Sequence, residues 1–154
     1  MIDRLLPRQL DNRYDGSRVA LWLLGLVAVL KLMMGGNSLL NAAEVASKAD
    51  GIPLDTFAPA AAREVVLLFE MAGLGQLVLA LLGALALVRY RAMVPLVFLI
   101  FLAEHAGRRL IVFANAVEAS RTLSPGFYIN MGLLALMLIG LTLSLMPRRA
   151  ALGR

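Results

Sequence analysis

FLIFLAEHAGRR, residues Phe98–Arg109, joins a strongly apolar run directly to a cluster of polar and charged side chains. The run is apolar enough to begin crossing a membrane, and it continues into Glu104, His105, Arg108 and Arg109. A charged side chain near the centre of a membrane-spanning helix costs about 2.5–3.5 kcal/mol on insertion scales. We therefore expect these side chains to lie inside a helical bundle and to pair there, because lipid would leave them unpaired.

The whole chain has the composition of a membrane protein. Of its 154 residues, 60% are hydrophobic and 16% are charged, and the apolar residues fall in runs that approach the 20 or so residues needed to cross a bilayer. The absence of cysteine excludes disulfides and thiolate metal sites. A single histidine excludes bis-histidine haem ligation within one chain and argues against a zinc site. We expect no cofactor and no metal.

The runs predict an all-α fold, an integral membrane bundle of four transmembrane helices that forms a single domain over residues 1–154. The predicted spans cover about 19–36, 60–88, 92–113 and 127–146, with an N-terminal segment at 1–18 and a loop at 37–59. Gly35-Gly36-Asn37 is a plausible exit from the first span, and Pro59 suits the first turn of the second. The third span could continue as helix to Ala119, and residues 120–126 read as a loop.

The distribution of basic residues predicts the orientation. If both termini and the turn at 89–91 share one side, that side holds nine of the 15 basic residues, which are Arg4, Arg8, Arg13, Arg18, Arg89, Arg91, Arg148, Arg149 and Arg154. Cytoplasmic loops carry the excess of lysine and arginine, so both termini are predicted to be cytoplasmic. We expect a multi-pass protein of a bacterial-type inner (plasma) membrane. Topology explains these arginines, and we therefore expect no nucleic-acid partner.

The polar side chains of the spans are predicted to share one layer in the outer half of the membrane. Helical rise places them at similar depths when each span is counted from its outer end. The candidate site, a ligand-binding site or a buried polar network, comprises Lys31, Glu70, Gln76, Glu104, His105, Arg108, Arg109, Tyr128 and Asn130.

Spacing within this layer suggests partners. Glu104 and Arg108 lie four residues apart with the acid first, the favourable order for an ion pair on a helix. Lys31 and Glu70 should pair with each other or with the cluster of the third span. The Glu104–Arg108 pair is either structural or part of a ligand or proton site. Lys31 and Arg109 could instead snorkel to the outer interface.

Small residues at helical spacing predict where helices approach closely. Ala72, Ala80 and Ala84 in the second span, and Gly132 and Gly140 in the fourth, are the candidates. Gly73-Leu74-Gly75 lies inside an apolar helix, so we interpret it as a packing or flexing feature and not as a nucleotide-binding loop.

The layout from Arg18 to Arg149 resembles the DoxX-like group of small bacterial four-helix membrane proteins. The similarity lies in RVALWLLGLVAVLK (Arg18–Lys31) and in FEMAGLGQLVLALLGALALVRYRAMVPL (Phe69–Leu96). The resemblance implies the topology and a general role, such as a membrane accessory subunit or a redox-associated protein.

Three functions fit the candidate residues. The first is a small non-enzymatic membrane protein that assists a larger complex or binds a lipid or small amphiphile. The second is an intramembrane enzyme in which Glu70 or Glu104 acts as acid or base, His105 is its partner, and Arg108 and Arg109 stabilise negative charge. The third is a proton-coupled carrier that uses the same residues. The expected partners are membrane lipid, other membrane-protein subunits or a second copy of the chain.

Overall fold

The protein is helical throughout the residues that its structure, a computed structural model, describes, which are 2–7, 9–115 and 125–147. The four long helices are α2 (Arg18–Leu40), α4 (Pro59–Val88), α5 (Val94–Ala114) and α6 (Pro125–Leu145). The short segments are α1 (Ile2–Leu5), α3 (Ala42–Glu44), the π-helical η1 (Val45–Ala49), and the 3-10 turns η2 (Leu54–Thr56) and η3 (Arg91–Met93). The predicted all-α fold is confirmed.

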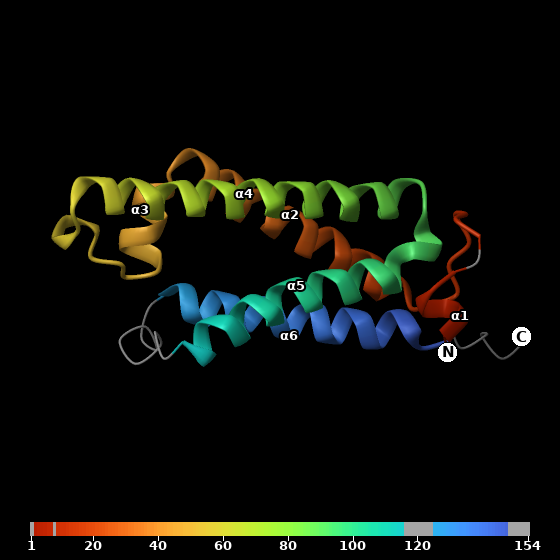
Figure 1. Cartoon of the computed structure of the whole chain (residues 1–154). Coiled ribbons are helices and arrows are strands. Elements are labelled where there is room, and N and C mark those ends of the chain that lie inside the picture. The colour runs from red at the N-terminus through yellow and green to blue at the C-terminus, as the bar shows by residue number, and fades with distance from the viewer. Residues whose placement is uncertain (1, 8, 116–124, 148–154) are drawn as a thin grey trace, which may run out of the picture.

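The long helices form two layers, with α2 and α4 above α5 and α6 (Figure 1). α2 packs along α4 and also contacts α6, and α5 packs against α6. The start of α2, the end of α6 and the turn between α4 and α5 lie at one end of the bundle, which we call the terminal end (Figure 1). α3 lies at the opposite end, which we call the loop end.

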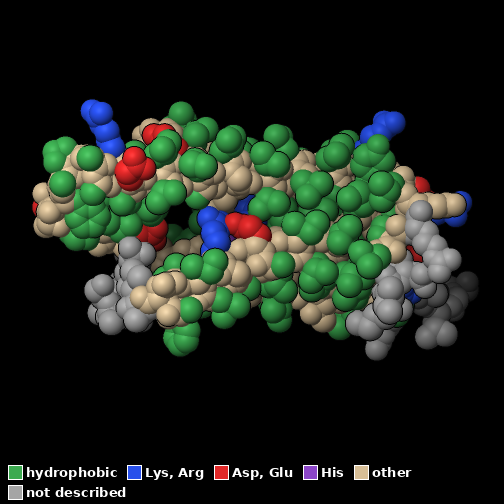
Figure 2. Space-filling model, in the orientation of Figure 1, with side chains coloured by type: hydrophobic (Ala, Val, Ile, Leu, Met, Phe, Trp, Pro, Cys, Tyr) green, Lys and Arg blue, Asp and Glu red, His purple; other side chains and the backbone are tan. Residues whose placement is uncertain are grey.

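Three helices are long and apolar enough to cross a membrane: Arg18–Leu40, Pro59–Val88 and Gly126–Leu145. α5 is not among them, because it carries Glu104, Arg108 and Arg109. Large apolar side chains are exposed along the sides of the helices, including Trp22 at 82% and Phe113 at 72%, and they cover much of the face seen in Figure 2. Such a surface suits lipid better than water.

Most helix boundaries follow the prediction closely, but the end of the first predicted span is wrong. Pro59 does lie in the first turn of α4. α2, however, runs through Gly35-Gly36-Asn37 and ends at Leu40, so these residues are not an exit. The first part of the predicted loop at 37–59 is helical, because it contains the end of α2, α3 and η1. The predicted extension to Ala119 and most of the loop at 120–126 lie outside the described residues.

Two glycines explain why α2 continues past this point. A Cβ atom on Gly35 would lie 2.9 Å from the carbonyl oxygen of Gly73, and one on Gly73 would lie 2.8 Å from the carbonyl oxygen of Gly35. The backbones of α2 and α4 therefore meet directly, as small residues allow in membrane helices. The predicted packing role of the Gly73 segment is confirmed, whereas Gly75 faces open space.

The apolar core fills the terminal half of the bundle. Its fully buried large side chains include Leu24 and Val27 of α2, Phe98 and Phe101 of α5, and Met137 of α6. These side chains come from three helices. On α2 and α5 they lie between the terminal end and residues Lys31 and Glu104. The two halves of the bundle are therefore packed differently, because the fully buried large apolar side chains lie in only one of them.

The other predicted small-residue contacts have mixed outcomes. Ala80 is buried, and the ring of Phe98 lies directly against Gly140, so these two predictions are confirmed. Ala72, Ala84 and Gly132 are exposed, and a Cβ atom on Gly132 would meet no atom within 4 Å. The prediction for these three positions is wrong, because the helices turn other faces toward each other.

The N-terminal segment closes the terminal end. The backbone N–H of Ser17 donates to the carbonyl of Leu143 on α6 at 3.2 Å, and the N–H of Ala92 donates to the carbonyl of Asp11 at 3.3 Å. Tyr14 lies between these attachments, and its hydroxyl donates to the Ser17 carbonyl. Burial raises the pKa of Tyr14 to about 12. The Ser17 hydroxyl also caps α2 by accepting from the N–H of Val19.

We predict that Gly73→Ala destabilises the bundle by about 1–3 kcal/mol, the usual cost of overpacking, because the new methyl group would collide with the backbone of α2. Gly75→Ala is the matched control, two residues away on the same helix and facing open space. It should be neutral or slightly stabilising, since alanine is the better helix former. Unfolding of the full chain in detergent measures both. Equal effects of the two substitutions would contradict the proposed contact.

Candidate functional site

A chain of three charged side chains joins α2 to α5 where the apolar core ends. Lys31 Nζ of α2 donates to Glu104 Oε2 of α5 at 2.8 Å. Glu104 Oε1 pairs with Arg108 Nη2, one turn further along α5, at 2.7 Å. Each carboxylate oxygen therefore has its own cation. The predicted Glu104–Arg108 pair is confirmed, and Lys31 pairs with the third-span cluster, one of the two arrangements expected.

Burial makes this chain asymmetric. The Lys31 side chain is 0% exposed, whereas Glu104 is 26% and Arg108 is 39% exposed. Lys31 Nζ also lies 5.3 Å from the centroid of the Phe101 ring, close enough for a cation–π interaction. Lys31 does not snorkel to the surface. Its ammonium group is stabilised in the interior by one carboxylate and one aromatic ring.

His105 lies beside the ion pairs and connects α5 to α6. Its side chain is buried, and Nε2 lies 3.1 Å from the carbonyl oxygen of Asn130. The Asn130 side chain in turn donates to the carbonyl of Gly126 at 2.7 Å, within the first turns of α6. Two of the predicted site residues, His105 and Asn130, are thus in direct contact.

A cavity of about 380 Å³ occupies the loop half of the bundle beside these residues. Four long helices and η1 contribute to its wall. The residues that line it are Met34, Asn37, Ser38, Val45, Ala49, Asp50, Leu68, Phe69, Ala72, Gln76, His105, Arg108, Arg109, Val112, Gly126, Ile129 and Asn130. Figure 2 shows a hollow in the surface between α4 and α5, with basic and acidic side chains beside it.

η1 closes the cavity at the loop end by resting on the start of α6. A Cβ atom on Gly126 would lie 2.8 Å from the carbonyl oxygen of Ala49 and 3.2 Å from Oδ1 of Asp50. Glycine at position 126 therefore permits this approach. The segment after α2, predicted only as an extramembrane loop, supplies part of the wall of the cavity.

Two buried acceptor atoms of residues that line the cavity have no hydrogen-bond partner in the described structure. They are Oε1 of Gln76 and Nδ1 of His105. Gln76 is 7% exposed and His105 is 3% exposed. A buried acceptor without a partner costs about 1–3 kcal/mol. Such atoms in the wall of a cavity indicate a site built for a polar ligand group.

The structure does not bring all predicted site residues together. Arg109 lines the cavity and lies with its guanidinium carbon 5.3 Å from the centroid of the Phe127 ring. Glu70 is half-buried on α4, outside the cavity lining, and among the described residues neither Lys31 nor His105 is its partner. Tyr128 is 60% exposed and packs edge-on against Phe127.

Other lining residues were missed by sequence reasoning. Asn37, Asp50 and Phe69 all line the cavity. The sequence predicts Asn37 to lie at the exit of the first span and Asp50 to lie in a loop. The sequence signal that could have indicated them is the pair of glycines Gly35 and Gly73. Their contact holds α2 and α4 together beside the cavity.

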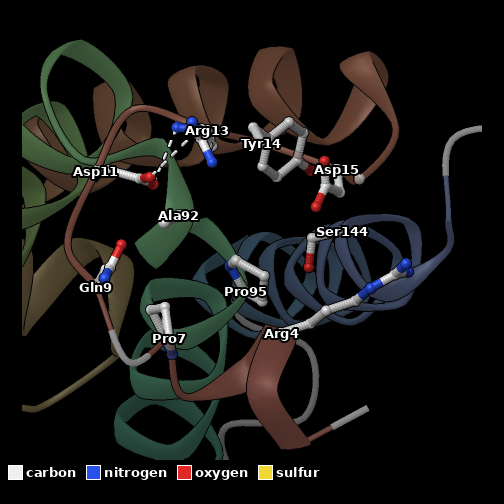
Figure 3. Close-up of a pocket in the computed structure, with 11 residues that line it drawn as sticks. Arg4, Pro7, Gln9, Asp11, Arg13, Tyr14, Asp15, Ala92, Pro95 and Ser144 are labelled. Carbon is white, nitrogen blue, oxygen red and sulfur yellow. Dashed lines mark hydrogen bonds and ion pairs between the residues drawn. The ribbon is translucent and has the colours of Figure 1, made fainter.

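A second cavity, of about 640 Å³, lies at the terminal end under the N-terminal segment (Figure 3). Its polar side chains are largely engaged within the protein. Asp11 pairs with Arg13, Arg4 donates to the carbonyl of Leu145, and the Ser144 hydroxyl donates to that of Leu141. This cavity is therefore a weaker candidate for a ligand site. No three acidic or histidine side chains of the described residues gather to hold a metal ion.

Comparison with protein-family models found no matching family, and comparisons with curated proteins and with solved structures found no match either. The resemblance to the DoxX-like group stays a prediction.

We predict that Glu104→Gln destabilises the bundle by about 3 kcal/mol, the low end of the range for breaking a buried ion pair, because Glu104 is partly exposed while Lys31 is not. Adding Lys31→Met should recover most of the loss, since it removes the buried charge. Unfolding in detergent measures this coupling.

Glu44→Gln is the control for this experiment. Glu44 pairs with Lys48 at 2.8 Å in an exposed i,i+4 arrangement, so its loss should leave stability unchanged. A Lys31→Met/Glu104→Gln variant as unstable as Glu104→Gln alone would show that the buried charge is not the cause.

Proposed function

We propose that the chain is a multi-pass membrane protein that binds an amphiphile in the cavity of its loop half. The single observation that carries the proposal is the composition of the cavity wall. Arg108, His105 and Gln76 form a polar region, and apolar side chains such as Leu68 and Ile129 line the remainder. A volume of about 380 Å³ lies within the range of small-molecule sites.

The opening of the cavity also suits a lipid-soluble ligand. The hollow in Figure 2 lies between α4 and α5, and apolar side chains cover most of the surface around it. A ligand could therefore enter sideways from the membrane, with its polar head toward the ion pairs and its apolar part directed outward.

The proposal includes four spans, with α5 as the fourth. The charged side chains that set α5 apart point inward at Glu104 and Arg108, where ion pairs reduce the cost of burial. We place the terminal end in the cytoplasm, because the basic residues concentrate there. The loop end and its cavity then lie in the outer half of a bacterial-type inner membrane.

Binding is better supported than acid–base catalysis or proton transfer. Both oxygens of Glu104 already accept from cations, so a ligand could reach this carboxylate only by breaking an ion pair. Glu70, the other predicted acid, lies outside the cavity lining. Among the described residues, neither of these two carboxyl groups is therefore a free partner for His105 at the cavity.

We predict that Ala72→Trp abolishes lipid retention by the full chain purified in mild detergent from a bacterial lipid extract. Ala72 lines the cavity, and an indole there would occupy the space of the ligand. Native mass spectrometry should show a bound lipid on the wild-type chain, and its occupancy should fall at least about tenfold in the variant, which corresponds to roughly 1.4 kcal/mol.

Ala84→Trp is the matched control, because Ala84 is exposed on the same helix and lies outside the cavity. It should retain lipid like the wild-type chain. The proposal is wrong if the wild-type chain retains no lipid, or if Ala72→Trp and Ala84→Trp retain it equally.

A further inference from the structure

The tautomer of His105 follows from its contact with Asn130. A carbonyl oxygen only accepts hydrogen bonds, so Nε2 of His105 must donate to it. A neutral imidazole that donates through Nε2 has its lone pair on Nδ1. The unpartnered Nδ1 is therefore an acceptor that requires a donor.

Gln76 adds a second acceptor from the opposite layer. Its Oε1 is buried without a partner, and the residue lines the same cavity from α4 as His105 does from α5. Carbonyl oxygens and imidazole lone pairs are satisfied by hydroxyl or N–H donors. A phosphate or carboxylate group alone supplies none, so an anion by itself would leave both acceptors unsatisfied.

The charge around the cavity favours an anion as well. Lys31 and Arg108 share one carboxylate, that of Glu104, so this chain of ion pairs carries one more positive than negative charge. In surroundings of low dielectric, an excess charge is stabilised strongly by a ligand of opposite sign. Arg108 lines the cavity, remains 39% exposed, and carries further N–H donors suited to a phosphate.

We propose that the ligand is a phospholipid with a singly charged phosphodiester and at least two hydroxyl groups on its headgroup. The phosphodiester lies toward Arg108, and the headgroup hydroxyls donate to Gln76 Oε1 and His105 Nδ1. This inference rests on the proposed function, of which it names the ligand class. A zwitterionic lipid adds no net negative charge, and a phosphodiester lipid whose headgroup carries neither hydroxyl nor N–H donors leaves both acceptors unsatisfied.

The test compares two lipids of equal charge and equal acyl chains. Phosphatidylglycerol has headgroup hydroxyls, and phosphatidylethanol has none. Native mass spectrometry titrations of the full chain in detergent should give a dissociation constant about fivefold to tenfold lower for phosphatidylglycerol, the ratio expected for about one hydrogen bond. Glycerophosphoglycerol, the same headgroup without acyl chains, should compete only weakly, which distinguishes a lipid from a free phosphodiester.

Gln76→Met should lower the ratio of the two dissociation constants, because methionine has a similar length and no amide oxygen. His105→Phe should do the same, and it serves as the second variant if Gln76→Met disturbs the adjacent Gly35 contact. Leu74→Met, with an exposed side chain outside the cavity on the same helix, should keep the wild-type ratio. Unfolding in detergent confirms that each variant is folded.

The outcomes separate this inference from the proposed function. Equal binding of the two lipids by the wild-type chain overturns the headgroup assignment and leaves lipid binding intact. A preference that survives both Gln76→Met and His105→Phe overturns the role of these acceptors. Competition by glycerophosphoglycerol as strong as that of the intact lipid overturns a membrane ligand. Failure of both lipids to bind, together with no retained lipid from the extract, overturns the proposed function itself.

Discussion

The ammonium group of Lys31 has no access to solvent, and this constraint determines how α2 and α5 must meet. Its side chain is 0% exposed, and its ion-pair partner is Glu104 at 2.8 Å. A buried charge without such a partner would cost several kcal/mol. The pairing fixes the depth of α5 relative to α2, and Arg108, which shares the same carboxylate, is thereby held at the wall of the cavity.

Packing differs on the two sides of this ion pair, and the difference creates the cavity. Toward the terminal end, Phe98 and Phe101 fill the space between helices. Toward the loop end, Gly35 and Gly73 draw α2 and α4 into backbone contact, and no aromatic side chain of α5 fills the space that remains opposite them. Charged and amide side chains border that space because they keep their polar ends solvated or paired.

The sequence predicted the ion pairs better than it predicted the helix faces. Four-residue spacing identified Glu104 with Arg108, and the cost of burial required a partner for Lys31. The helices are apolar on nearly every side, however, so nothing in their pattern distinguishes the face toward the bundle from the face toward lipid. Glu70 and Tyr128 were assigned to the polar site by their depth alone. Depth does not tell which face of a helix a residue lies on. Gly35-Gly36 was misread because glycine occurs both at helix ends and at close helix contacts.

The distribution of hydrogen-bond acceptors distinguishes a ligand site from a structural network. A purely structural network would satisfy its own acceptors, as the network of Lys31, Glu104 and Arg108 does through a separate cation at each Glu104 oxygen. Gln76 and His105 lie beside that network, are at least as well buried as Glu104, and each retains an acceptor without a partner. A group that lies between the helices and carries its own donors would satisfy both, and we propose that it enters through the hollow between α4 and α5.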